Sequence, residues 1–126
     1  MIQYDDAPDV KENICNIVSR ADLKHVILEN LSCIRSKGTS SRRVIARCYA
    51  LPRIMQKALN IKPQYIIEVI SERFDRLSDD EKMKTLIHEL MHIPRSFGGG
   101  FIHHNIVNAK GVEKIWQKLK NSLTTD

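Results

Sequence analysis

The segment LIHELMHIPRSFGGGFIHH, residues 86–104, contains four of the five histidines in the chain. Its string HELMH places His88 and His92 on either side of Glu89. Residues four apart project from the same face of a helix, so both imidazoles could reach one ion at the ~2.0–2.1 Å that zinc prefers. Glu89, one step further round, could reach a water on that ion and act as the general base of metal-assisted hydrolysis. The spacing therefore predicts a zinc site that activates water.

The residues before this string predict the helix that carries it. Ser78 and Glu81 have the spacing of a capping box, in which a hydroxyl and a carboxylate satisfy the exposed amides of a first helical turn. A helix over 79–93 is expected to follow, with an apolar stripe that excludes His88 and His92. The stripe consists of Met83, Leu86, Ile87, Leu90 and Met91. Chance alone produces an HExxH string in roughly one chain in a hundred of this composition, so this context is what favours a metal site over an ordinary helix surface.

The segment after the helix offers candidates for a third ligand. A catalytic zinc site usually takes three protein ligands and keeps a fourth position for water. Pro94 predicts the end of the helix, and the glycines at 98–100 allow the chain to turn sharply. His103 and His104 would then return toward the ion, and either could be the third ligand. The other, or Arg95, could stabilise an oxyanion. The alternative interpretation is a pair of exposed loop histidines.

Periodicity elsewhere in the chain predicts an α+β fold. Helices are expected at 8–21, 52–59, 79–93 and 108–123, and strands at 25–34, 44–50 and 65–71. The first two strands are expected to pair as a hairpin whose tip is the basic loop 35–43. The predicted fold class is a small mixed sheet of about three to four strands packed on helices, with residues 1–126 forming one domain. The strand at 65–71 could occupy an edge or an interior position.

Composition places the chain among soluble globular proteins. Hydrophobic residues make up 42% and charged residues 28%, and no run approaches the ~18–20 apolar residues that span a bilayer. The N-terminal stretch is acidic where a secretory signal has a basic end and an apolar run. We therefore expect a cytoplasmic protein with no membrane segment. Cys15, Cys33 and Cys48 form no CxxC pair and are expected to be buried free thiols.

The net charge of +5 permits a polyanionic partner without requiring one. The candidates for phosphate contact are the basic residues in and beside the loop 35–43. They are Arg35, Lys37, Arg42 and Arg43. Serine, threonine and glycine between them suit backbone contacts to phosphate, but no aromatic residues are interleaved for base stacking. Two interpretations stay open, a weak nucleic-acid contact and a solvated hairpin tip.

The residues around HELMH resemble a zincin metallopeptidase, because His88-Glu89-x-x-His92 matches that signature in full. The stretches HIPRSFGGGFIHH and YIIEVISERFDRLSDDEKMKTLIHELMHIP are similar to a small group of archaeal and phage metallopeptidases related to the SprT-like and WLM families. The resemblance implies a minimal zincin core with His88 and His92 as zinc ligands and Glu89 as the general base. It favours His104 over His103 as the third ligand. The chain lacks the third histidine that the metzincin pattern places six residues after His92.

These predictions together indicate a zinc-dependent peptidase with one zinc ion per chain and a protein or peptide substrate. The zincin resemblance also implies that the substrate binds as an added strand on an edge strand, for which 65–71 is the candidate. One alternative is a nucleic-acid-associated module with a structural metal, and another is a zinc hydrolase that acts on a non-peptide amide. The SprT-like resemblance implies that the peptidase and nucleic-acid hypotheses could both hold, because proteases of that kind act on proteins crosslinked to DNA.

Overall fold

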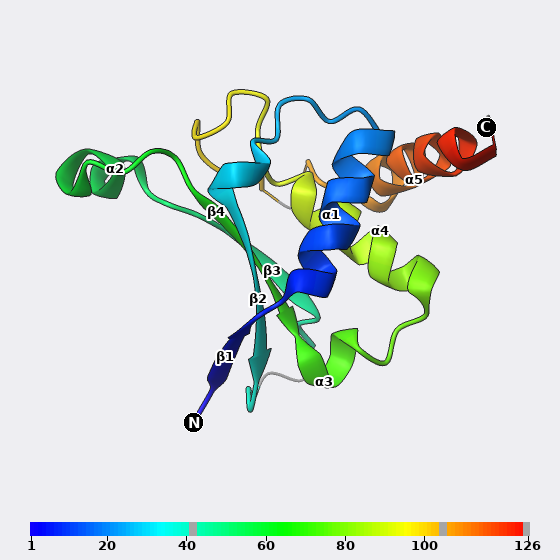
Figure 1. Cartoon of the computed structure of the whole chain (residues 1–126), viewed down its shortest axis with the longest axis horizontal. Coiled ribbons are helices and arrows are strands. Elements are labelled where there is room, and N and C mark those ends of the chain that lie inside the picture. The colour runs from blue at the N-terminus through cyan, green and yellow to red at the C-terminus, as the bar shows by residue number, and fades with distance from the viewer. Residues whose placement is uncertain (41–42, 104–105, 125–126) are drawn as a thin grey trace.

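The computed structural model describes residues 1–40, 43–103 and 106–124. In chain order its elements are β1 (Gln3–Asp6), α1 (Pro8–Arg20), a 3-10 turn (Leu28–Asn30), β2 (Leu31–Lys37), β3 (Ala46–Ala50), α2 (Arg53–Leu59), β4 (Tyr65–Ile70), α3 (Ser71–Phe74), α4 (Asp79–Leu90) and α5 (Ala109–Thr124). The strands form one four-stranded mixed sheet, and α1, α4 and α5 lie on the same side of it (Figure 1). The predicted α+β class is confirmed.

The strand order in the sheet is β1-β2-β4-β3. β4 runs parallel to β2 and antiparallel to β3, and β1 runs antiparallel to β2. The predicted hairpin between 25–34 and 44–50 is therefore wrong, because β4 lies between the two strands. β3 becomes an edge strand of this sheet, and β4 becomes an interior one.

The side chains of β4 explain its central place. Tyr65, Ile67 and Val69 are buried on the helix side, and Glu68 and Ile70 are buried on the other side. A strand that buries both faces is expected inside a sheet, where its sequence reads as a nearly continuous apolar run. Of the two positions left open for 65–71, the interior one is observed, so this strand is not the edge that could receive a substrate. Among the described strands, β3 is the one that lines the site described below.

The first long strand begins later than its sequence suggests. Residues 25–30 form a loop that ends in the 3-10 turn, and β2 then extends through Arg35 to Lys37. Lys11 of α1 holds this start in place, because its Nζ donates to the carbonyl oxygens of Leu28 and Leu31. Three residues that the sequence assigned to a basic loop, Arg35, Ser36 and Lys37, are thus part of the sheet.

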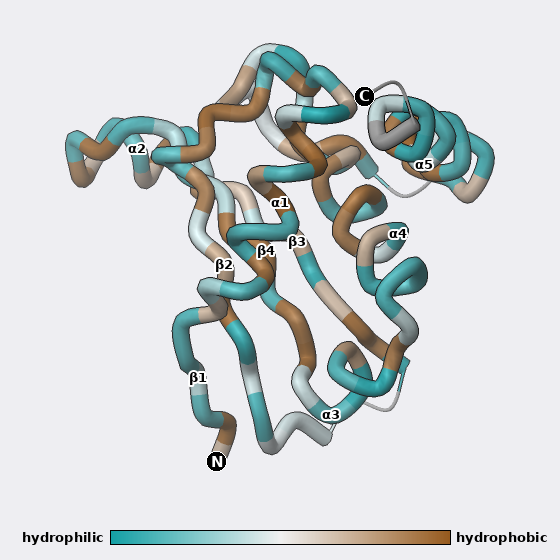
Figure 2. Tube along the Cα trace, turned by 45° about the vertical axis from the view of Figure 1, so that its right-hand side comes forward, coloured by the Kyte–Doolittle hydropathy of each residue, from teal (hydrophilic) through white to brown (hydrophobic). Residues whose placement is uncertain are grey.

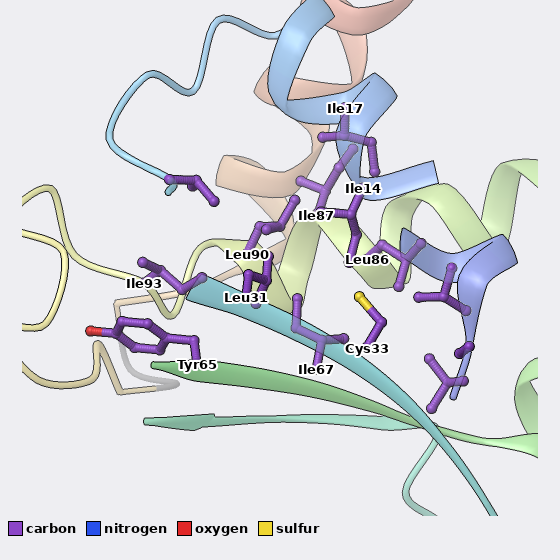
Figure 3. Close-up of a cluster of buried hydrophobic side chains, with 14 of the residues drawn as sticks. Ile14, Ile17, Leu31, Cys33, Tyr65, Ile67, Leu86, Ile87, Leu90 and Ile93 are labelled. Carbon is purple, nitrogen blue, oxygen red and sulfur yellow. The ribbon is translucent and has the colours of Figure 1, made fainter. Parts of the chain in front are cut away.

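The hydrophobic core lies between the sheet and the helices (Figure 3). Leu86 and Ile87 of α4 are fully buried, and Leu90 is nearly so. They pack with α1 and with the helix side of β2 and β4, through Ile14, Ile17, Leu31, Cys33, Tyr65 and Ile67. Full burial of such a side chain contributes about 1.5–3 kcal/mol. The apolar stripe predicted for α4 therefore fixes the rotation of this helix and turns His88 away from the core.

Helix α5 packs against α4. Val112, Trp116 and Leu119 are buried there, as the amphipathic pattern predicts. Lys84 of α4 lies over the ring of Trp116, with its Nζ 5.5 Å from the ring centroid.

The three cysteines are unbridged, as their spacing predicts. Cys33 is buried in the core, whereas Cys15 and Cys48 are half-buried. Among the described residues, no helix has the length and apolarity that crossing a membrane would need.

Candidate metal centre

His88, Glu89 and His92 lie together at the end of α4. One ligand atom from each lies within 4.8 Å of the others, and the two imidazole centroids are 5.2 Å apart. The helix tightens here, because the amide of His92 donates to the carbonyl of Glu89 at 3.1 Å. Glu89 and His92 are buried, and His88 is half-buried. Two imidazoles at this spacing could hold a metal ion, with the Glu89 carboxyl group beside them.

A pair of hydrogen bonds orients His92. Its Nδ1 lies 2.5 Å from the carbonyl oxygen of Ile102, and the amide of Ile102 donates to the carbonyl of His92 at 2.8 Å. A contact between a ring nitrogen and a carbonyl requires the proton on Nδ1, so in the neutral ring Nε2 carries the lone pair that a metal needs. Outer contacts of this kind fix the tautomer and the plane of a ligating histidine.

Phe101 holds the His92 ring from its other side. The two rings are stacked, with centroids 4.5 Å apart and an interplanar angle of 7°. His92 is thus clamped by two consecutive residues of the segment that follows the glycines. The ring plane is set before any ion binds, which lowers the entropic cost of binding one.

The glycine loop is tied to the sheet by Tyr65. The hydroxyl of Tyr65 accepts from the amide of Gly98 at 3.2 Å and donates to the carbonyl of Gly100 at 2.5 Å. Gly98 and Gly100 have φ of +92° and +117°, and a Cβ on Gly98 would come within 2.5 Å of Pro63. A side chain would be strained at either position. Tyr65 therefore determines where Phe101 and Ile102 reach His92.

Tyr65→Phe is expected to lower zinc affinity by about tenfold, because outer contacts of a ligand typically contribute 10–100-fold. The free energy of unfolding should fall by about 1–2 kcal/mol, since two loop groups lose their partner. Competition titration against a zinc chelator, together with urea unfolding, measures both effects. Tyr4→Phe, at an exposed tyrosine of β1, is the matched control. Unchanged zinc affinity in Tyr65→Phe would show that the loop does not position His92.

Glu89 is a buried carboxylic acid beside the two histidines, with 6% of its surface exposed. Burial raises its pKa from 4.5 to about 7, because the charged form loses its hydration. A carboxyl group poised near neutral pH can take a proton from one group and return it to another. A nearby cation would stabilise the charged form, so a bound metal is expected to lower this pKa.

Glu89 should make the metal-free protein less stable at alkaline pH. At about pH 4 the carboxyl is protonated in both states, and as the pH rises through 7 ionisation favours the unfolded chain by on the order of 3 kcal/mol. In urea unfolding with excess chelator, Glu89→Gln should be more stable than wild type at about pH 8 and nearly equal to it at low pH. Glu12→Gln, at an exposed position, should change little. A Glu89→Gln variant no more stable than wild type at about pH 8 would contradict a buried, ionising Glu89.

An open cleft of about 1020 Å³ is lined by His88, Glu89 and His92. β3 forms one wall, α4 forms its floor, and Phe101 and the first turns of α5 close it on the remaining sides. Cys48 of β3 lines the cleft, and burial, with Glu89 nearby, raises its pKa to about 12. Cys48 is therefore a protonated thiol in an otherwise largely apolar wall. The cleft follows the free edge of a strand, a shape that admits an extended chain.

The remaining residues predicted for the metal site have different outcomes. His103 is exposed, and its ring centroid is 5.8 Å from that of Phe101. It is not part of the His88, Glu89 and His92 group. His104 lies outside the described residues, so its role as third ligand stays a prediction. Arg95 does not line the metal cleft but a separate hollow that also contains His25, a position that does not support its predicted oxyanion role.

The predicted nucleic-acid residues do not form one group in the described part of the chain. Arg35 lies on β2, where it donates to Asp9 at 2.8 Å and to Asp75 at 2.7 Å. These ion pairs raise the pKa of the Arg35 guanidinium and connect α1 and the end of α3 to the sheet, so the structure gives Arg35 a different role. Lys37 and Arg43 are exposed, and Arg42 lies outside the described residues.

The sequence did not predict the residues that connect the end of α4 to the glycine loop. Phe101 and Ile102 stand directly before the histidine pair, and Tyr65 begins a strand that reads as ordinary core. An aromatic residue beside a pair of histidines was the one available signal for Phe101. Nothing in the sequence indicated that the hydroxyl of Tyr65 bonds to the glycine loop 35 residues later.

The site has side chains that could hold a metal ion in an open cleft. The model of a protein family described as "Putative phage metallopeptidase" matches residues 2–124. The chain therefore belongs to this metallopeptidase family. No curated protein and no solved structure matches it.

Proposed function

We propose that this metallopeptidase uses zinc, held by His88 and His92, with Glu89 as the general base of peptide hydrolysis. The observation that carries the proposal is the His88, Glu89 and His92 group, with its buried carboxyl, at the floor of an open cleft. When bound there, zinc supplies Lewis-acid polarisation and lowers the pKa of a bound water toward ~7. One zinc ion per chain is expected, with His104 or His103 as the third ligand.

The other proposed roles in the reaction belong to side chains of the protein itself. His92 presents Nε2 because Ile102 fixes the proton on Nδ1, and Phe101 restricts the ring to one plane. Glu89 takes a proton from the attacking water and delivers it to the leaving amine, and its position beside both histidines suits both steps. His103, exposed beside Phe101, is the candidate to stabilise an oxyanion if His104 is the ligand.

The substrate is proposed to bind along β3. β3 is an edge strand that borders the cleft, whereas β4 is covered on both sides. An extended peptide can pair with the free edge through main-chain hydrogen bonds, with little demand on side-chain identity. This geometry favours a peptide over a small amide, for which an enclosed pocket would be the better fit.

A nucleic-acid-binding module is the second candidate function, and Lys37 and Arg43 are the exposed residues that favour it. Binding that falls steeply with salt and is lost in Arg42→Ala/Arg43→Ala would support it. Binding to nucleic acid that is unaffected by these substitutions would exclude the basic loop. The relation to SprT-like and WLM proteins and the cytoplasmic location stay predictions.

Elemental analysis of zinc tests the proposed function. Wild type purified without added metal is expected to contain one zinc per chain, and only one of His103→Ala and His104→Ala should lose it. Loss in His104→Ala alone would leave His103 for the oxyanion. Folded wild-type protein that takes up no zinc or other transition metal, even after reconstitution, would overturn the proposal.

A further inference from the structure

Helix α2 projects from the body of the molecule (Figure 1). It forms the connection between β3 and β4, and none of its seven residues is buried. A helix this short is not stable by itself in water, and most helices in proteins gain their stability from packing one face. The surface of α2 therefore contributes little to the stability of the fold.

The exposed surface of α2 is apolar. Ile54 is 78% and Leu59 is 55% exposed, and Figure 2 shows hydrophobic stretches along this projection. Tyr49 and Ile66 extend the surface, because they pair across β3 and β4 at the end from which α2 departs. We call this the α2 surface, and it comprises Tyr49, Ile54, Met55, Leu59, Ile61 and Ile66, all exposed. Several large apolar residues exposed in one region of a structure can mark an interaction site.

The α2 surface is bordered by positive charge. Residues 51–64 contain Arg53, Lys57 and Lys62 but no aspartate or glutamate. The carboxylate nearest along β4 is Glu68, which is buried and accepts from the hydroxyl of Tyr49 at 2.6 Å. Charge complementarity calls for a partner that combines apolar side chains with acidic ones. A second copy of this chain, with its net charge of +5, fits poorly.

The position of α2 connects it to the metal cleft. β3 lines the cleft and leads directly to α2. At the other end of the projection, Pro63 packs against Gly98 and Tyr65 binds the glycine loop. A chain that lies on the free edge of β3 and extends past Ala50 would therefore reach the α2 surface. This continuity favours a protein substrate over a membrane as the occupant.

We propose that the α2 surface is a docking site for an acidic, apolar segment of the protein substrate, beyond the residues that occupy the cleft. This inference rests on the proposed function. It names the substrate class: proteins in which the scissile bond is followed or preceded by acidic residues interleaved with large apolar ones. The cleft then requires only an extended main chain, and selection among substrates takes place at α2.

Three peptides test the proposal. The first fills only the cleft, the second carries an added acidic and apolar segment, and the third has lysine in place of each acidic residue. Wild type is expected to cleave the acidic peptide with a KM about tenfold lower than that of the short one, at similar kcat. Ile54→Ser/Leu59→Ser and Lys57→Glu should remove this advantage. Ile2→Ser and Lys118→Glu, at exposed positions away from α2, are the matched controls.

Binding is measured separately with the Glu89→Gln variant, by fluorescence anisotropy of the same labelled peptides at low and high salt. Binding of the acidic peptide that weakens with salt and requires Ile54 and Leu59 supports the docking site even if no peptide is cleaved, in which case the proposed function alone fails. Equal cleavage of all three peptides, unaffected by the α2 variants, overturns the docking site and leaves the proposed function intact.

Two other outcomes would assign the α2 surface to a different occupant and overturn the inference. One is self-association in sedimentation experiments that Leu59→Ser removes, which would indicate a second copy. The other is binding to phosphatidylglycerol vesicles, lost in Ile54→Ser/Leu59→Ser, without α2-dependent binding of the acidic peptide.

Discussion

Glu89→Gln is expected to lower kcat/KM for peptide hydrolysis by about 10²–10⁴-fold, the range that a general base contributes. Glutamine has nearly the same shape but cannot take a proton from water. The zinc content should stay at one per chain, because Glu89 is proposed to act on the water and not to bind the ion. The loss should therefore appear in kcat, measured with a quenched fluorescent peptide and zinc-loaded protein.

The control for Glu89 is Glu113→Gln. Glu113 also lines the cleft, but it lies on α5, where it pairs with Lys84 at 3.5 Å. Its substitution should change kcat/KM by only a small factor. Peptidase activity that survives in Glu89→Gln would come from a different site or from a contaminant, and the role proposed for Glu89 would be abandoned.

His88→Ala and His92→Ala are each expected to lower zinc affinity by more than about a hundredfold, since losing a ligand exceeds the effect of losing an outer contact. The two variants should differ in the stability of the metal-free protein. His92 is fully buried, stacked on Phe101 and bonded to Ile102, so His92→Ala should cost about 2–4 kcal/mol. His88 is half-buried, and its substitution should cost far less.

Isothermal titration with zinc and urea unfolding in excess chelator measure the two effects separately. His25→Ala is the control, because His25 is a half-buried histidine outside the metal cleft. Full zinc affinity in His88→Ala would remove that residue from the ligand set. Equal stability of the two metal-free variants would mean that the clamp on His92 contributes nothing before metal binds.

The helix that carries the site was predictable because its signals are local. The capping box of Ser78 and Glu81 is present, with the Glu81 amide donating to the Ser78 hydroxyl at 3.2 Å. The four-residue step from His88 to His92 begins in the last turn of α4, and most of the apolar stripe lies in the same helix. Spacing along a helix determines direction in space, so the sequence alone could bring these side chains to one side.

The strand order was not predictable in the same way. β2 and β3 follow each other among the strands and look like a hairpin, yet β4 inserts between them because it buries both of its faces. The strand order therefore depends on which of several distant segments buries the most apolar surface at the centre of the sheet. The same is true of Arg35, whose partners Asp9 and Asp75 are 26 and 40 residues away.

Within the site, the contacts around His92 are the ones that the sequence could least predict. The stacking of Phe101 and the hydrogen bonds of Tyr65 join residues from a loop, a strand and the end of a helix. Sequence periodicity cannot reveal such contacts, because each is a single contact between distant residues and follows no repeated spacing. The third ligand belongs to the same category, and for this reason the choice between His103 and His104 needs an experiment.

Because α2 adds no buried residue to the core, its sequence is under little constraint from folding. The ends of the projection already meet, since the amide of Leu51 donates to the carbonyl of Gln64 at 2.9 Å. Residues 52–62 could therefore be replaced, even by a tight turn, with little effect on the rest of the fold, whereas Pro63 is kept by its contact with Gly98. A change in the sequence of α2 should therefore alter what this surface contacts and leave the free energy of unfolding nearly unchanged.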